Sequence, residues 1–111
     1  MIYVASPYTH SSEEVMERRY EEVCAFCATA AIAGYNVYSP IAHWHPIAKK
    51  HLLPKDESWW KEANEDILKR CDQLWILRLD GWLQSDGILR EVKFAKLNGI
   101  RVLKKGGKGN V

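Results

Sequence analysis

Four short apolar runs, separated by stretches with helical character, constrain the fold of this 111-residue chain more than any other feature. The first run, Ile2 to Ala5, stops at Ser6-Pro7. The others are Tyr35 to Tyr38, Asp72 to Leu77 and Ile100 to Leu103. Runs that lack polar alternation are typical of strands buried on both faces, as in parallel sheets. The connections between them are long enough for helical crossovers, so the pattern predicts repeated strand-helix units.

The first connection carries signals for both ends of a helix. Ser11 with Glu14 three residues later matches a capping box, and the following residues favour a helix through Ala33, closed by Gly34. The expected inner stripe of this helix consists of Tyr20, Cys24, Cys27 and Ala31.

The later connections differ from one another. Residues 41–55 hold three histidines and two prolines without a clean period, which indicates a long loop. Asp56 or Ser58 can cap a helix before the third strand. Ser85 can cap the next helix, which should end at Asn98-Gly99.

Strands alternating with helices predict an α/β fold: one domain with a parallel sheet, most simply a flavodoxin-like three-layer sandwich. We expect it to span residues 1–103, followed by a flexible basic tail at 104–111. Ligands of such folds bind beyond the carboxyl ends of the strands. This rule gathers Ser6 to His10, Ser39 to His45 and Asp80 to Ser85 at one edge.

The composition limits the kinds of partner that we expect for this protein. With 16 basic and 14 acidic residues the net charge is only +2, which does not indicate a surface for a nucleic acid polymer. No apolar stretch approaches the ~20 residues that span a bilayer, and the chain opens on a strand without a leader. We therefore expect a cytoplasmic protein with no membrane partner. Cys24-x-x-Cys27 lies too far into its helix for redox chemistry, so both cysteines should be packing residues.

The richest motif is Ser85-x-Gly87-x-x-x-Glu91-x-x-x-Ala95-x-x-x-Gly99. It places Glu91 on the apolar stripe of a helix, where a carboxylate is costly without a use. The motif resembles the signature of the nucleoside 2-deoxyribosyltransferase superfamily, in particular its short, mostly uncharacterised members. The opening from Ile2 to Tyr8 is similar to the first strand and loop of that group, and the resemblance extends to about Leu103.

The resemblance implies cleavage of an N-glycosidic bond, or deoxyribosyl transfer, on a nucleotide or nucleoside. It assigns Glu91 as the nucleophile and Tyr3 as the residue that orients it. Ser85 favours a 5′-phosphorylated substrate, since relatives acting on monophosphates carry serine there. The expected substrate-binding residues are Ser6, Pro7, Tyr8, His43, His45, Asp80, Gly81, Trp82, Ser85 and Gly87.

The second acid departs from the family pattern. The position at which the family has an aspartate holds Asn64 here, and Asp66, two residues later, is the first substitute. Asp80 and a protonated histidine are further candidates. Because Asn64 weakens the catalytic assignment, a non-catalytic nucleotide-binding sensor is the alternative function. A flavodoxin-type mononucleotide carrier is disfavoured, since the first loop lacks a phosphate-cradling run.

The histidines and tryptophans admit other readings. His43, His45 and His51 have spacings seen in zinc sites, but no thiolate or hard ligand accompanies them, so we expect neither metal nor cofactor. Trp82 is placed to stack on a base, and Trp59-Trp60 to form a subunit contact. A domain of this size has little room to enclose a nucleotide alone, so we expect a homodimer or larger assembly.

Overall fold

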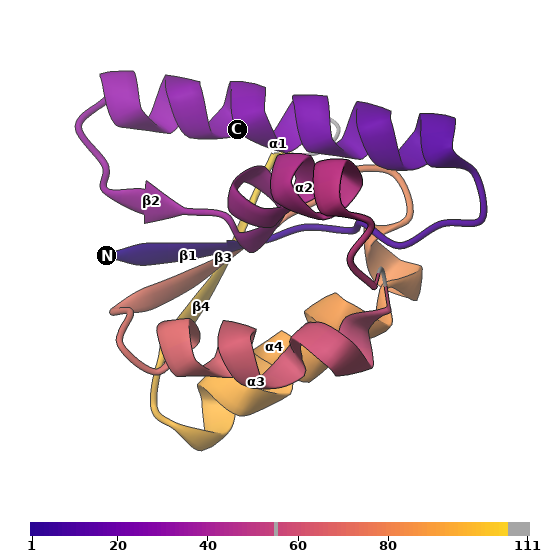
Figure 1. Cartoon of the computed structure of the whole chain (residues 1–111). Helices are drawn as coiled ribbons and strands as arrows, with labels where there is room; N and C mark the ends of the chain where they lie inside the picture. The colour runs from indigo at the N-terminus through magenta and orange to yellow at the C-terminus, as the bar shows by residue number, and fades with distance from the viewer. Residues whose placement is uncertain (55, 107–111) are drawn as a thin grey trace.

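A parallel four-stranded sheet lies between two helical layers in the computed structural model of the chain, which describes residues 1–54 and 56–106 (Figure 1). The strand order is β2-β1-β3-β4. The strands are β1 (Ile2–Ala5), β2 (Val37–Tyr38), β3 (Gln73–Leu77) and β4 (Arg101–Lys105). Helices α1 (Glu13–Ile32) and α2 (Pro40–His51) lie on one side of the sheet, and α3 (Glu57–Leu68) and α4 (Asp86–Leu97) on the other. A 3-10 turn, η1 (Trp82–Gln84), precedes α4. The predicted flavodoxin-like single domain is confirmed.

The central strand β1 explains why the core has two halves. Tyr3 and Val4 are both fully buried, and they point to opposite faces because side chains alternate along a strand. Tyr3 joins Leu68 and Leu74 in the cluster under α3 and α4. Val4 joins Val23 in the cluster under α1. A strand buried on both faces needs no polar alternation, which is why the apolar run predicted it correctly.

Helix caps at two of the predicted positions are confirmed. Asp56 accepts a hydrogen bond from the backbone N of Trp59 at 2.9 Å, and Ser85 accepts one from the backbone N of Ile88 at 3.2 Å. Among the described helices, none combines the length and the hydropathy that a bilayer-spanning segment needs.

The predicted cap of α1 was wrong, and its predicted inner face was right only in part, since Cys27 packs against the cluster of Val4 and Val23 while Ala31 is exposed. Ser12, rather than Ser11, is the N-cap and accepts from the backbone N of Val15 at 3.3 Å. The buried positions of α1 are Met16, Val23 and Ala30. Helix α1 carries small residues on several of its faces, so its sequence gives little indication of which face is buried.

The loop predicted for residues 41–55 was wrong over most of its length, because α2 occupies Pro40–His51. Ser39 caps it by accepting from the backbone N of Ala42 at 3.0 Å. Pro40 stands in the first turn, where its missing N–H costs nothing. Pro46 lies inside the helix and disguised it in the sequence. Lys55 lies outside the described residues.

The last strand is longer than predicted. Lys104 and Lys105, which were assigned to the basic tail, form the end of β4 beside Ile76 and Leu77. The rest of the predicted tail, from residue 107 onward, lies outside the described residues.

Candidate functional site

A cavity lies at the carboxyl edge of the sheet, between the loop after β1 and helices α2, α3 and α4. We call it the edge cavity. Its volume is about 90 Å³, and its wall is made of Ser6, Tyr8, Thr9, Pro40, Ile41, Trp44, His45, Ala48, Pro54, Trp60, Lys61, Asn64, Glu65, Gly87, Arg90 and Glu91. A wider hollow, the adjoining pocket, shares Tyr8, Thr9 and Arg90 with it. Because pockets for small molecules usually have about 300–1,000 Å³, the edge cavity holds only part of a nucleotide-sized ligand, and the rest would extend into the adjoining pocket.

The contact between Tyr3 and Glu91 joins the sheet to this wall. The Tyr3 hydroxyl donates a hydrogen bond to Glu91 Oε2. Burial, with the Glu91 charge as a second cause, raises the pKa of Tyr3 well above its ordinary value. The phenol therefore stays protonated and remains a donor. Ile88 and Ala95 are buried on the same face of α4, so packing fixes the direction in which Glu91 points. The contact expected from the resemblance is present.

Ser6 is the buried hydroxyl of the wall. It directly follows β1 and is 7% exposed, and its Oγ has no hydrogen-bond partner among the described residues. A buried hydroxyl without a partner costs roughly 1–3 kcal/mol. A hydroxyl or phosphate oxygen of a ligand in the edge cavity would satisfy it.

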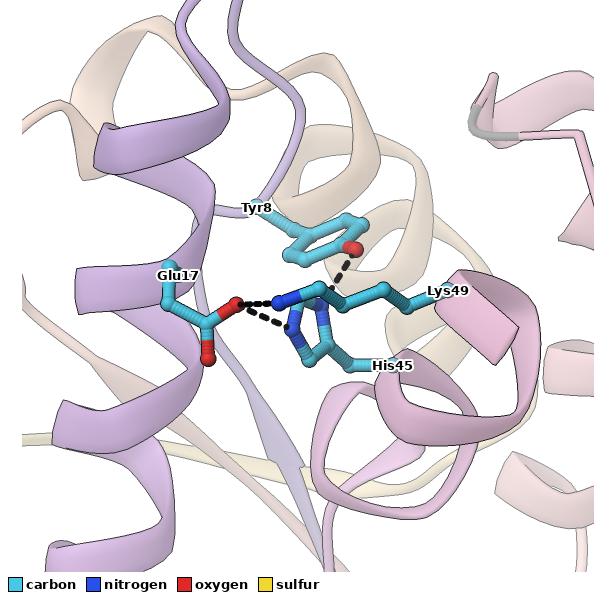
Figure 2. A network of polar contacts seen from close by, with 4 residues as sticks. All are labelled: Tyr8, Glu17, His45 and Lys49. Atoms are coloured by element: carbon cyan, nitrogen blue, oxygen red, sulfur yellow. Dashed lines mark hydrogen bonds and ion pairs between the residues drawn. The ribbon is translucent and has the colours of Figure 1, made fainter. Parts of the chain in front are cut away.

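A chain of polar contacts crosses from the cavity wall to α1 (Figure 2). The Tyr8 hydroxyl lies 2.7 Å from His45 Nδ1, and His45 Nε2 lies 3.1 Å from Glu17 Oε1. Lys49 Nζ donates to the same Glu17 oxygen at 2.9 Å. The Tyr20 ring stacks on the imidazole, with centroids 4.2 Å apart. His45 is thus fixed by both ring nitrogens and by one ring face.

The charged groups in this series of contacts stabilise one another. Hydrogen bonds from Lys49 and then from His45 lower the pKa of Glu17, so Glu17 is a carboxylate that only accepts. The hydrogen bond to Glu17 raises the pKa of Lys49. Burial raises the pKa of Tyr8, so its phenol is protonated.

Sequence reasoning placed Tyr8 and His45 at the pocket but missed Glu17. The usable signal was the spacing of His45 and Lys49, which are four residues apart and share one helical face once 40–51 is recognised as a helix. The contact of that face with α1 is long-range, and no local pattern predicts it.

Arg19 fastens the two loops beside the site. Its Nη1 donates to the carbonyl oxygens of Tyr8 at 3.3 Å and Thr9 at 3.2 Å. Its Nη2 donates to the carbonyl oxygen of Asp80 at 3.2 Å. Gly81 has φ +90°, and a Cβ there would stand 2.5 Å from Arg19 Nη2. A side chain at residue 81 would displace the guanidinium and would have to adopt the left-handed φ that favours glycine.

The other residues predicted from the motif divide between the two hollows. Gly87 lines the edge cavity. Ser85 and Gly81 line the adjoining pocket, together with Arg19. Asp80 contributes its carbonyl to the Arg19 contact and lines neither hollow.

Three further predicted binding residues lie away from both hollows. Pro7 is fully buried. Trp82 packs against the core cluster under α3 and α4, with Lys104 Nζ 6.0 Å from its ring centroid. His43 is exposed and makes ring contacts with Tyr38 and Trp44. The structure does not bring these three to the edge cavity.

Asp66, the expected second acid, is also outside the wall. Its side chain is 55% exposed and pairs with Lys69 at 3.1 Å and with Arg70 at 3.6 Å. The Lys69 hydrogen bond, with the Arg70 charge, lowers its pKa, which opposes a role as proton donor. Asn64 occupies the wall instead.

Within residues 1–54 and 56–106, no group of three or more His, Cys, Asp or Glu side chains is arranged to hold a metal ion.

The fold and the site define a class: a small flavodoxin-like α/β protein whose edge cavity presents a carboxylate held by a buried tyrosine. The chain belongs to the family described as "Domain of unknown function (DUF1937)", whose model matches residues 1–106. A search of curated proteins finds no match. The family description names no activity and does not link the chain to the nucleoside 2-deoxyribosyltransferase superfamily.

Proposed function

We propose that this protein cleaves the N-glycosidic bond of a nucleotide or nucleoside, with Glu91 as the nucleophile. The observation that carries the proposal is the hydrogen bond from Tyr3, which holds the Glu91 carboxylate in the wall of the edge cavity. A carboxylate kept on the buried face of a helix, aimed at a cavity and oriented by a neutral phenol, suits chemistry at a cationic centre.

The reaction places specific demands on that carboxylate. As the bond between the base and C1′ breaks, the sugar carbon gains oxocarbenium character, and Glu91 attacks it to form a glycosyl ester. Water or a second base then displaces the ester and restores Glu91. Tyr3 is a positioning residue, because it contacts Glu91 and lies fully buried in the sheet.

Other wall residues supply binding. The Trp44 and Trp60 rings lie 4.9 Å apart and both line the edge cavity, which gives the base an aromatic surface. Ser6 offers its hydroxyl to the sugar. In the adjoining pocket, Ser85 at the start of α4, Arg90 of α4 and Arg19 of α1 favour a 5′-phosphate, although Asp56 and Asp86 line the same pocket. The substrate panel must therefore contain both phosphorylated and free nucleosides.

Assembly belongs to the same proposal. The edge cavity is too small to enclose a nucleotide, and Trp59, 53% exposed, stands beside Trp60 near its wall. We propose that a second copy of the chain covers this region in a homodimer or larger assembly. Light scattering coupled to size-exclusion chromatography tests this assembly. The wild type should have the mass of a dimer or larger, and Trp59→Ser should shift the mass toward that of the monomer. A wild type with the mass of a monomer would exclude the assembly.

The test of the activity is direct. The purified protein is incubated with ribo- and deoxyribonucleoside monophosphates and with the free nucleosides, and released base is measured by chromatography. Wild type should release base and Glu91→Ala should not. Glu21→Gln, on the exposed side of α1, is the matched carboxylate control and should retain activity. Base release that survives Glu91→Ala would refute the nucleophile.

A non-catalytic nucleotide sensor is the second candidate, favoured by the neutral Asn64 amide in the cavity wall. It predicts no base release, together with a rise in melting temperature when a nucleotide is added. The same panel of compounds separates the two functions.

A further inference from the structure

The proposed cleavage requires a proton donor distinct from Glu91, because most bases leave poorly as anions. Besides Glu91, the wall of the edge cavity contains the phenol of Tyr8 and the imidazole of His45, each of which can donate a proton. Glu65 also lines the cavity and pairs with Lys61 at 3.5 Å. Tyr8 and His45 belong to a continuous series of contacts that leads away from the cavity to α1.

The direction of each hydrogen bond between Tyr8, His45 and Glu17 follows from the carboxylate of Glu17. A carboxylate only accepts, so His45 Nε2 carries the proton that points to Glu17. In the neutral imidazole, Nδ1 then has a lone pair and accepts from the Tyr8 hydroxyl. In the imidazolium, Nδ1 donates to the Tyr8 oxygen, and the phenolic hydrogen must turn toward another acceptor. Tyr8 lines both the edge cavity and the adjoining pocket, so a ligand bound there can supply that acceptor.

We propose that Tyr8, His45 and Glu17 form the proton relay that serves the leaving base, with Tyr8 as the group that touches it. This inference rests on the proposed function. Tyr8 is the catalytic residue, and His45 and Glu17 are positioning residues that act through it.

The protons and electrons of the step balance. As the bond between C1′ and the base nitrogen breaks, its electron pair goes to the nitrogen, which takes the phenolic proton of Tyr8. The step starts from the form in which His45 is an imidazolium: its Nδ1 proton moves to the Tyr8 oxygen, and the ring becomes neutral. When water later attacks the glycosyl ester, it gives one proton to Tyr8, whose own proton returns to Nδ1. The protein ends in its starting state.

The charged and titratable groups joined to His45, directly or through Glu17, fit this scheme. Glu17 and Tyr20 contact it from α1 and Tyr8 from the loop after β1, while Lys49 of α2 contacts Glu17. Lys49 and His45 share one oxygen of Glu17, so Lys49 balances the Glu17 charge and leaves Nε2 as a donor. The stacked Tyr20 ring holds the imidazole plane, so Nδ1 stays directed at Tyr8.

The experiment compares two leaving groups. The full-length protein acts on the nucleotide or nucleoside found active in the panel and on its counterpart with a better leaving group: the N7-methylated analogue of a purine, or the 5-fluoro analogue of a pyrimidine. A better leaving group needs less protonation. Tyr8→Phe should slow the ordinary substrate by about 10²–10⁴-fold, the range typical of general acid catalysis, and slow the analogue much less. Tyr35→Phe makes the same chemical change at an exposed tyrosine far from the cavity and should slow neither.

A second variant guards against a folding defect. Glu17→Gln keeps the shape of a partly exposed side chain, and it should give a smaller loss that is again selective for the ordinary substrate. Its pH profile should also shift, which a merely structural role would not produce. If Tyr8→Phe does not fold, this variant alone decides.

The outcomes separate the two proposals. A wild type that cleaves both substrates, with relay variants that slow both equally or neither, overturns the relay and leaves the Glu91 chemistry standing. A wild type that releases base from no substrate overturns the proposed function and the relay with it. A selective loss in the relay variants, with Glu91→Ala inactive on both substrates, supports both.

Discussion

The hydrogen bond between Tyr3 and Glu91 can be measured by a double-mutant cycle in stability, without any substrate. Tyr3→Phe removes the hydroxyl but keeps the ring, whose centroid lies 6.1 Å from that of Tyr38. The core contacts of residue 3 should therefore survive. A hydrogen bond to a charged group contributes roughly 1.5–3 kcal/mol. We expect Tyr3→Phe to lower the free energy of unfolding by about that amount.

The cycle adds Glu91→Ala and the double variant, each unfolded in urea at neutral pH. In Glu91→Ala the Tyr3 hydroxyl is buried without its acceptor, so this variant should also lose stability. The double variant has neither group, so its loss should be smaller than the sum of the single losses. The expected coupling free energy is about 1.5–3 kcal/mol. A coupling below ~0.5 kcal/mol, the limit of ordinary additivity, would refute the claim that Tyr3 holds Glu91.

The same bond sets an expectation for catalysis. If Tyr3 orients Glu91 for attack, Tyr3→Phe should lower kcat/KM by about 10- to 150-fold, since each 1.36 kcal/mol corresponds to a tenfold change in rate. The melting temperature identifies the fraction of folded protein in that assay. Full activity in Tyr3→Phe would show that Glu91 does not depend on this bond.

Three further expectations concern stability. Glu17 has a pKa lowered by the Lys49 hydrogen bond above all, so its stabilising effect is present at neutral pH and is lost as the pH falls through that lowered pKa; Glu17→Gln should be less stable than wild type at neutral pH and equal to it in acid, as urea titrations at both pH values would show. Gly81→Ala forces a left-handed alanine against Arg19 and should cost about 1–3 kcal/mol in chemical denaturation. Leu68 is fully buried under the sheet, so Leu68→Ala should cost about 2–5 kcal/mol, and a loss near zero would contradict its place in the core.

The elements that the sequence predicted well are those whose signals are local. The buried strands appear in the sequence as apolar runs. Asp56 and Ser85 cap their helices through contacts with residues three positions later. Helix α2 was not predicted because Pro46 and the clustered polar side chains obscure its helical periodicity, although Ser39-Pro40 is a strong signal for the start of a helix. The buried face of α1 was hard to predict because alanines lie on several sides of the helix.

The site shows the same division. The Tyr3 contact with Glu91 was anticipated, since the resemblance links two motifs at opposite ends of the chain. Glu17 was missed because its contact with His45 depends on how α1 packs on α2, which no spacing within either helix encodes. Asp66 was chosen for its position in the sequence, whereas its helix turns the carboxylate toward Lys69 and away from the cavity wall.

Arg19 makes the two loops at the mouth of the site mechanically dependent on one another. One guanidinium holds carbonyl oxygens on the segment that carries Tyr8 and on the segment that carries Asp80. A guanidinium that follows one segment loses its hydrogen bonds to the other, so a movement that keeps all three bonds must carry both segments together.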